Sequence, residues 1–202
     1  MVWLLDRHCS STPPHWTVAI GASGSAGLSD IKALLAALSP GINAVVLVVL
    51  HRLFDHPSKL REVLAGATAM PIIIAEQGEC FERGCCYIGE PSAHLTLAGR
   101  SFGGLVGDPG ATHRGRTVDL LFQSLAAHGE TRVIGVVLSG ALDDGSRGLA
   151  AIHAAGGQTM VITPNNSVEP GMPENAIGYD GPISCIGSPR QIAAAINQLV
   201  GA

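Results

Sequence analysis

Three polar residues in this chain have side chains that together could hydrolyse an ester or an amide, and each follows a run of apolar residues. Ser23 comes after one such run, His51 ends a second, and Asp144 follows a third. A serine hydroxyl can attack a carbonyl carbon, and an imidazole of ordinary pKa, about 6.5, can remove the hydroxyl proton. A carboxylate can fix the imidazole tautomer and stabilise its positive form. The order Ser, His, Asp differs from that of the α/β-hydrolases, but geometry defines a triad.

Each of these residues also has an ordinary structural explanation. Ser23 lies in a turn between Gly21 and Gly24, where serine commonly caps a helix or cradles a phosphate. His51 fits a histidine at a strand end, and Asp144 precedes glycine in a common turn pair. Their joint position after predicted strands, rather than any one of them, indicates nucleophilic catalysis.

The elements that would position these residues alternate along the chain. Continuous apolar runs predict buried strands over 17–21, 43–50, 132–138 and 158–162, with a shorter strand near 183–186. Helical spacing and start signals predict helices over 29–38, 58–65, 117–127, 148–155 and 189–200. This alternation predicts an α/β fold: a three-layer, doubly wound, mostly parallel sheet of Rossmann-like type. In such folds ligands collect outside the carboxyl ends of the strands.

The middle of the chain has a different pattern. Four short β-like segments separated by Gly or Pro cover 71–75, 85–88, 94–97 and 101–106, and predict a β-hairpin insertion. No repeat or linker divides the rest. We expect residues 1–16 to be an N-terminal lead-in and residues 17–202 to form one catalytic domain.

Composition excludes several classes of protein. The chain has 202 residues, of which 47% are hydrophobic, enough for a sizeable core. A net charge of −4 and 4% aromatic residues argue against a nucleic-acid partner. The apolar run 42–50 is too short to insert in a membrane, and the first residues do not form a signal peptide. Five cysteines without a regular framework favour a reduced, cytoplasmic chain.

A set of motifs in register resembles the CheB-type chemotaxis protein-glutamate methylesterases from about Thr17 to the C-terminus. Three of them contain the residues above: Ile20-Gly-Ala-Ser23, Val-Leu-His51 and Gly140-Ala-Leu-Asp143-Asp144-Gly145. The others are Tyr87-Ile-Gly-Glu-Pro91-Ser-Ala-His94-Leu-Thr-Leu97, His113-Arg114 ahead of Val118-Asp119-Leu-Leu-Phe122, Ala154-Ala-Gly156-Gly157 and Gly171-Met-Pro173. No single motif is specific, but their shared order is.

The resemblance implies an activity and roles for three residues. The family hydrolyses methyl esters on glutamates of chemoreceptor cytoplasmic helices and releases methanol, and many members deamidate receptor glutamines. The resemblance implies Ser23 as nucleophile, His51 as general base and acid, and Asp144 as the orienting carboxylate. It implies methylated chemoreceptor helices as partners, and it requires neither a metal nor an organic cofactor.

This chain departs from the family pattern in the segments where we expect the oxyanion hole. The family's Thr-Gly-Gly after the serine is Gly24-Ser25-Ala26 here, and its Met-Gly before the acidic pair is Ala141-Leu142. We expect the backbone amides of Gly24 and of Ala141 or Leu142 to act as oxyanion donors. The loop 164–170 also departs from the family's usual acidic, Ser-rich version.

Family members commonly carry an N-terminal receiver domain whose phosphorylation relieves blockage of the active site. The lead-in of this sequence is too short for a receiver and has no acidic phosphoacceptor cluster. We therefore expect a stand-alone esterase that is either constitutive or controlled by a regulator in trans.

Other functions stay open at this point. The spacing Gly21-x-x-Gly24-x-x-Gly27 resembles a dinucleotide fingerprint, although His51-Arg52 stands where its acidic residue is expected. A non-catalytic homologue could dock on acidic receptor helices through Arg52, Arg114 and Arg116, which otherwise are ordinary surface residues. The cysteines match no metal-ligand spacing, so we expect no metal site.

Overall fold

The computed structural model describes residues 16–51, 59–90, 93–99, 102–107, 115–128, 132–165 and 168–201. Seven strands form one parallel sheet in the order β3-β4-β2-β1-β7-β8-β9. They are β1 (Trp16–Ser23), β2 (Ala44–His51), β3 (Ile72–Ile74), β4 (Cys86–Ile88), β7 (Val133–Val137), β8 (Gln158–Ile162) and β9 (Cys185–Gly187). The helices are α1 (Gly24–Ala37), α2 (Leu60–Ala65), α3 (Thr117–Ala127), α4 (Ser146–Ala154), α5 (Met172–Tyr179) and α6 (Pro189–Val200). Strands β5 (Ala93–Gly99) and β6 (Phe102–Gly107) pair only with each other.

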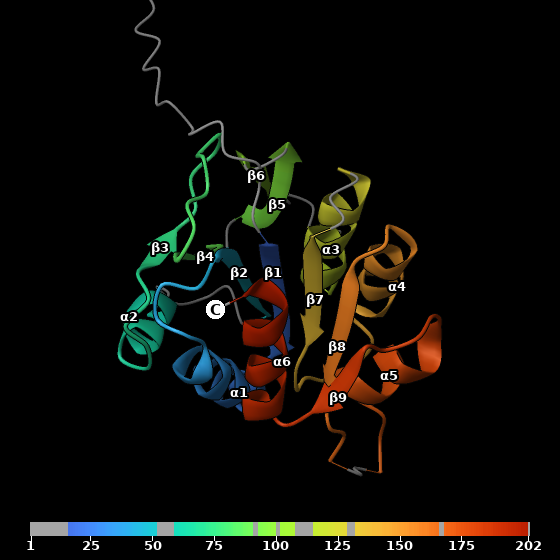
Figure 1. Cartoon of the computed structure of the whole chain (residues 1–202). Helices are drawn as coiled ribbons and strands as arrows, with labels where there is room; N and C mark the ends of the chain where they lie inside the picture. The colour runs from blue at the N-terminus through green and yellow to red at the C-terminus, as the bar shows by residue number, and fades with distance from the viewer. Residues whose placement is uncertain are drawn as a thin grey trace, which may run out of the picture.

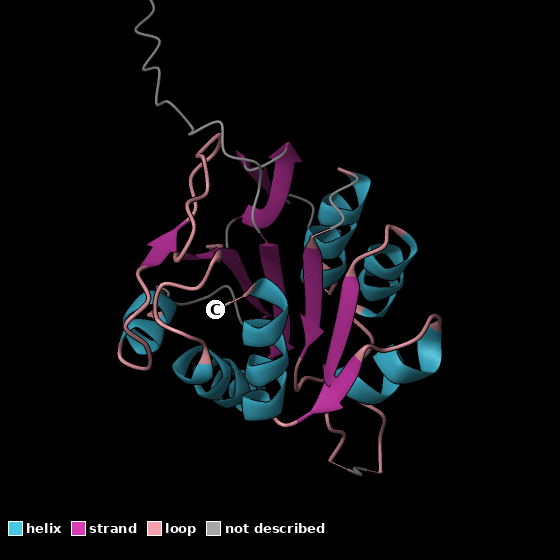
Figure 2. Cartoon of the chain, in the orientation of Figure 1, coloured by secondary structure: helices cyan, strands magenta, loops and turns pink. Residues whose placement is uncertain are grey.

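Helices cover both faces of the sheet, so the predicted three-layer α/β fold is confirmed. Apolar residues of α1, α2 and α6 pack on one face, and those of α3, α4 and α5 pack on the other. Figures 1 and 2 show α1 and α6 in front of the strands and α3 behind them. Because both faces are covered, the central strands are apolar without alternation, as the burial of Ala44–Val49 shows.

The chain winds outward from β1 in two directions, so the strand order reverses at the middle of the sheet. Strand β1 lies between β2 and β7. Helix α1, which follows β1, packs on one face, whereas α4, which follows β7, packs on the other. In Figure 1 the arrows of β1 and β7 point the same way, so their carboxyl ends meet at one edge. Open α/β sheets bind ligands at such a switch point.

The predicted hairpin insertion is confirmed for β5 and β6, which pair antiparallel. It docks on α3: the Leu97 N–H donates to Ser124 Oγ at 2.9 Å, and His128 Nε2 lies 2.8 Å from the Leu97 carbonyl oxygen. Figure 1 shows the hairpin beyond the amino ends of β1 and β7, away from the switch point. The expectation of hairpins at 71–75 and 85–88 is wrong, because β3 and β4 are parallel strands of the main sheet.

Several helix starts, and one whole helix, differ from the sequence-based expectation. Helix α1 begins at Gly24, directly after Ser23, rather than at Ser29. Helix α5 was not expected as a helix at all. Its start signals are present in the sequence, since Pro173 lies in the first turn and the Glu174 carboxylate accepts from the Gly171 N–H at 2.9 Å.

The described cysteines differ in their chemical state. Of the described cysteines, Cys85, Cys86 and Cys185 are free thiols, whereas Cys80 is disulfide-bonded, so the expectation of a fully reduced chain is wrong for Cys80. Burial raises the pKa of the Cys86 thiol. None of the helices in the described ranges is long and apolar enough to cross a membrane.

The buried Tyr87 in β4 should make the free energy of unfolding fall at alkaline pH. Its ring packs against Phe81, with the ring centroids 4.3 Å apart and the planes tilted by 41°. Its hydroxyl accepts from the Glu82 N–H, and burial raises its pKa to about 12. The unfolded chain ionises this tyrosine near pH 10, so stability that is complete below pH 10 falls between pH 10 and about 12. Urea unfolding should show a shallower alkaline fall in Tyr87→Phe than in wild type, while exposed Tyr179→Phe leaves the fall unchanged. Parallel falls in all three proteins would contradict this.

Candidate active site

Ser23 sits at the point where β1 becomes α1. It is the last residue of the strand and the N-cap of the helix, with extended backbone angles of −141° and 145°. Gly24 follows with a φ of +69°, a left-handed conformation that glycine adopts without cost. Within the described structure the Ser23 side chain makes no capping hydrogen bond to α1. The hydroxyl is therefore not committed to the helix-cap role, and the sharp turn presents it at the sheet edge.

The loop after β7 lies directly against Ser23. The Ser23 N–H donates to the Ser139 carbonyl at 3.0 Å, and a Cβ added to Gly140 would come within 2.8 Å of Ser23 Cβ. Only glycine at position 140 allows this approach. Sequence reasoning placed Gly140 in a motif but gave it no role. Its close contact brings the backbone of the oxyanion candidates to the serine.

His51 stands beside Ser23 on the neighbouring strand. The parallel register of β1 and β2 pairs Ser23 with His51, residue for residue. Adjacent strands lie about 4.8 Å apart, so an imidazole here is within reach of the serine side chain. The His51 side chain is half-buried, and its last strand position leaves it at the same sheet edge.

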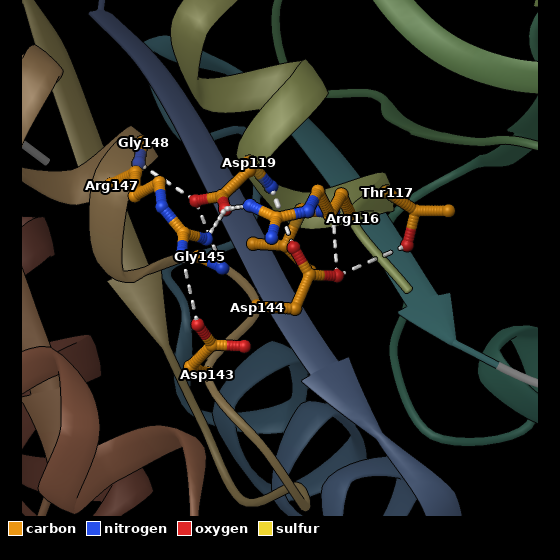
Figure 3. Close-up of polar contacts among 9 residues, drawn as sticks. Arg116, Thr117, Asp119, Asp143, Asp144, Gly145, Arg147 and Gly148 are labelled. Carbon is orange, nitrogen blue, oxygen red and sulfur yellow. Dashed lines mark hydrogen bonds and ion pairs between the residues drawn. The ribbon is translucent and has the colours of Figure 1, made fainter. Parts of the chain in front are cut away.

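Asp144 is buried and bound to the start of α3. Its Oδ2 accepts from the Val118 N–H at 3.0 Å, and its Oδ1 accepts from the Asp119 N–H at 2.9 Å (Figure 3). The Thr117 hydroxyl lies 3.4 Å from Oδ2. Burial raises the pKa of the Asp144 carboxyl and the negative charge of Asp119 raises it further, whereas the two N–H donors and the charge of His51 lower it.

Asp119 makes the complementary contacts in the other direction. Its Oδ1 accepts from the N–H groups of Gly145 and Gly148, at 3.1 and 2.8 Å, at the start of α4. Its Oδ2 lies 3.4 Å from Arg147 Nη1 and 4.0 Å from Arg116 Nη1. Sequence reasoning did not assign Asp119 a role. The signal in the sequence is the position of Asp119 in the first turn of a predicted helix. In the structure its side chain is buried.

Asp143, the neighbouring acid, differs from Asp144 in its exposure and in its partners. The Asp143 side chain is 53% exposed, and its Oδ2 forms an ion pair with Arg147 Nη2 at 3.3 Å. Asp144 is 5% exposed, and the charge of His51 is among the causes that lower its pKa. The geometry therefore favours Asp144 over Asp143 as the orienting carboxylate.

The three oxyanion candidates differ in how firmly the structure holds them. Gly24 is the first residue of α1, and the N–H groups of a first helical turn have no acceptor within the helix. Ala141 forms an isolated antiparallel bridge with Gly171, and the Met172 N–H donates to the Gly140 carbonyl at 2.8 Å. The start of α5 therefore anchors the loop that holds Ala141 and Leu142.

Leu142 adopts a strained conformation in this loop. Its φ is +67°, the one positive value among non-glycine residues in the described ranges, and it occupies the position where the resembled family has glycine. Its side chain is 68% exposed, while its carbonyl accepts from Asn175 Nδ2 at 2.7 Å. A left-handed backbone costs leucine ~1–2 kcal/mol, a cost that glycine avoids. Glycine loses more backbone entropy on folding, and this loss offsets only part of the gain.

Leu142→Gly is accordingly expected to raise the free energy of unfolding by ~0.5–1 kcal/mol, measured by urea denaturation. Because the side chain is exposed, little packing is lost. Leu142→Ala is the matched control, since it removes the side chain but keeps the strain. A glycine variant no more stable than the alanine variant would show that position 142 carries no backbone strain.

The glycine spacing that resembles a dinucleotide fingerprint has another explanation in the structure. A Cβ on Gly21 would lie within 3.0 Å of Val118 Cβ, and one on Gly27 would lie 2.6 Å from the Ser139 carbonyl oxygen. Gly21 lets α3 approach β1, and Gly27 lets the loop after β7 approach α1. Of the three glycines, only Gly24 faces open space. The spacing therefore fits internal packing better than pyrophosphate binding.

Of the three arginines predicted to dock the substrate, the structure describes only Arg116. Arg52 and Arg114 lie outside the described residues. Arg116 directly precedes α3 with a half-exposed side chain near Asp119. In the described ranges, no three His, Cys, Asp or Glu side chains gather as a metal site.

Comparison with known proteins shows the family of the chain. The family model described as CheB methylesterase matches residues 18–196. A protein-glutamate methylesterase/protein-glutamine glutaminase from Burkholderia thailandensis is 34% identical over 92% of this chain and 51% of its own length. One from Geobacillus kaustophilus is 32% identical over 98% of this chain and 58% of its own. The chain thus spans about half the length of these relatives.

The fold has a close counterpart among solved structures. The crystal structure of the Thermotoga maritima CheB methylesterase catalytic domain matches with a TM-score of 0.80, covering 93% of this chain and all of that one. The two sequences are 23% identical, so this likeness concerns the fold. With the family model matching nearly the whole sheet and its helices, the chain belongs to the CheB methylesterase family.

Proposed function

We propose that this chain hydrolyses glutamate γ-methyl esters, with Ser23 as nucleophile, His51 as general base and acid, and Asp144 as the carboxylate that stabilises the imidazolium. The observation that carries the proposal is the register that pairs Ser23 with His51 at the carboxyl ends of adjacent strands. Buried Asp144, whose pKa responds to the charge of His51, supports the third role. The names of the curated relatives support a methylesterase and glutaminase activity.

The chemistry follows from these positions. His51 takes the Ser23 proton while Oγ attacks the ester carbonyl, and the negative charge moves to the carbonyl oxygen. Backbone N–H groups of Gly24 and of Ala141 or Leu142 would stabilise that oxygen. Collapse of the tetrahedral intermediate breaks the carbonyl carbon–OCH₃ bond, and the imidazolium protonates the departing methoxy group to give methanol. Water, deprotonated by His51, then attacks the acyl-serine and releases a glutamate carboxylate and free Ser23.

The same site can deamidate glutamine. An amide carbonyl forms the same tetrahedral intermediate, and ammonia leaves in place of methanol after protonation by His51. No other residue is needed. A single chain with both activities would therefore lose both on substitution of Ser23.

The substrate is proposed to be a methylated cytoplasmic helix of a chemoreceptor, and the reaction to take place in the cytoplasm. Such helices carry acidic residues around the methylated glutamates, and Arg52, Arg114 and Arg116 would provide opposite charges. Arg116 lies at the start of α3, next to the residues that bind Asp144, which supports a docking position beside the site. Control by a second protein acting in trans is part of the same proposal.

Methanol release from methylated receptor membranes tests the function. We expect the chain to release methanol from methylated membranes, and ammonia from receptors with glutamine at the same sites, but nothing from unmethylated membranes with glutamate there. A non-catalytic docking protein would bind these membranes without releasing either product. Sedimentation with the membranes, measured in the same samples, separates these two outcomes.

A further inference from the structure

Two buried carboxylates at the site hold each other's helices. Asp144, in the turn before α4, accepts hydrogen bonds from the start of α3, whereas Asp119, in the first turn of α3, accepts them from the start of α4 (Figure 3). Both side chains are 5% exposed or less. Each carboxylate therefore satisfies N–H groups that would otherwise lack an acceptor in a buried place.

We propose that Asp119 is a positioning residue of the active site, which fixes the backbone of Asp144 through Gly145 and is itself fixed by the carboxylate of Asp144. This inference rests on the proposed function. Gly145 directly follows Asp144, so the Gly145 N–H bond to Asp119 constrains the backbone of the residue proposed to orient His51. Loss of the Asp119 carboxylate removes the bonds at the start of α4, and loss of the Asp144 carboxylate removes those at the start of α3.

The atoms used by Asp119 allow its position and its charge to be separated. Both amides bond to the same oxygen, Oδ1, whereas Oδ2 faces Arg147 and Arg116. An asparagine can place its carbonyl oxygen at Oδ1 and keep both amide bonds. Asp119→Asn therefore removes the charge and the Arg147 hydrogen bond and retains the two amide bonds, whereas Asp119→Ala removes all of them.

The charge of Asp119 acts on the same site. The charged groups around the carboxylate pair come from three elements and the loop before α4: Arg116 and Asp119 at α3, Arg147 on α4, His51 on β2 and Asp143 in the loop. The negative charge of Asp119 raises the pKa of Asp144, so its removal makes the protonated form of Asp144 less favourable. The acid limb of a pH–rate profile should thus move to lower pH in Asp119→Asn.

The test measures steady-state hydrolysis of a glutamate γ-methyl ester peptide by each protein. A separate sample of the same protein is titrated with a serine-reactive phosphonate, so that rates are expressed per functional site. In Asp119→Ala we expect kcat to fall ~100-fold with KM nearly unchanged, since a displaced Asp144 acts in the chemical step. Asp119→Asn should restore most of kcat at neutral pH and show the shifted acid limb. Ser188→Ala, which removes a comparable cap from α6, is the matched control and should leave kcat unchanged.

The outcomes separate this inference from the proposed function. If wild type is labelled and active but Asp119→Ala keeps full kcat per labelled site, Asp119 has a structural role only and the inference is wrong. The same conclusion follows if Asp119→Asn is as damaged as Asp119→Ala and its acid limb does not move. If wild type neither reacts with the phosphonate nor hydrolyses the ester, the proposed function fails and the inference fails with it.

Discussion

Ser23→Ala is expected to lower kcat for ester hydrolysis by ~10⁴–10⁶ while leaving the fold intact. The reaction loses its nucleophile, and the residual rate comes from whatever the oxyanion donors and His51 contribute to direct attack by water. Stability should change little, because the Ser23 side chain makes no capping bond to α1. Methanol release gives the rate, and urea denaturation checks the fold.

The matched control for this variant is Ser25→Ala, an exposed serine two residues further along the same turn. It should retain full activity. A double variant, Ser23→Ala with His51→Ala, should be no slower than Ser23→Ala alone, because residues that act as one catalytic unit are strongly non-additive. If instead the two losses multiply, Ser23 and His51 do not act on the same step.

Asp144→Asn is expected to lower kcat per labelled site by ~10⁴, because an amide cannot stabilise the imidazolium and favours the wrong tautomer. The structure adds a second effect. Both carboxylate oxygens of Asp144 accept from backbone N–H groups, so the NH₂ of an asparagine must face a donor. The start of α3 then loses one bond, and the free energy of unfolding should fall by ~1–2 kcal/mol.

Asp143→Asn separates these effects from a general change of charge in the same turn. Its side chain is exposed and pairs only with Arg147 among the described residues, so we expect near wild-type kcat and stability. If Asp143→Asn is the damaging change and Asp144→Asn is silent, the carboxylate has been assigned to the wrong residue.

Much of the fold could be predicted because buried parallel strands leave a plain signal. The runs that became β1, β2, β7 and β8 are apolar without alternation, and α3 and α6 begin and end where their spacing indicated. Sequence does not identify β3 and β4, the two strands at one end of the sheet, as members of it. They have three residues each, and pairing with a distant strand cannot be read from so short a segment. Helix α5 was missed because its glycine N-cap is a weak signal beside the proline.

The site could be predicted as a set of strand-end residues but not as a geometry. Sequence places Ser23 and His51 at the ends of strands, whereas only the sheet order and register show that these strands are adjacent and in step. The reciprocal contacts of Asp119 and Asp144 join residues 25 positions apart in the chain. Such contacts depend on how α3 and α4 pack, and nothing local in the sequence encodes them.

The central claim is that Ser23 is an activated nucleophile, and covalent labelling tests it most directly. Wild-type protein should react with a fluorophosphonate at a single residue, identified as Ser23 by mass spectrometry of its peptides. The adduct should be absent from Ser23→Ala and should form far more slowly in His51→Ala, because the imidazole activates the hydroxyl. A protein that remains unlabelled, or that carries the adduct on another residue in wild type and Ser23→Ala alike, would contradict the account.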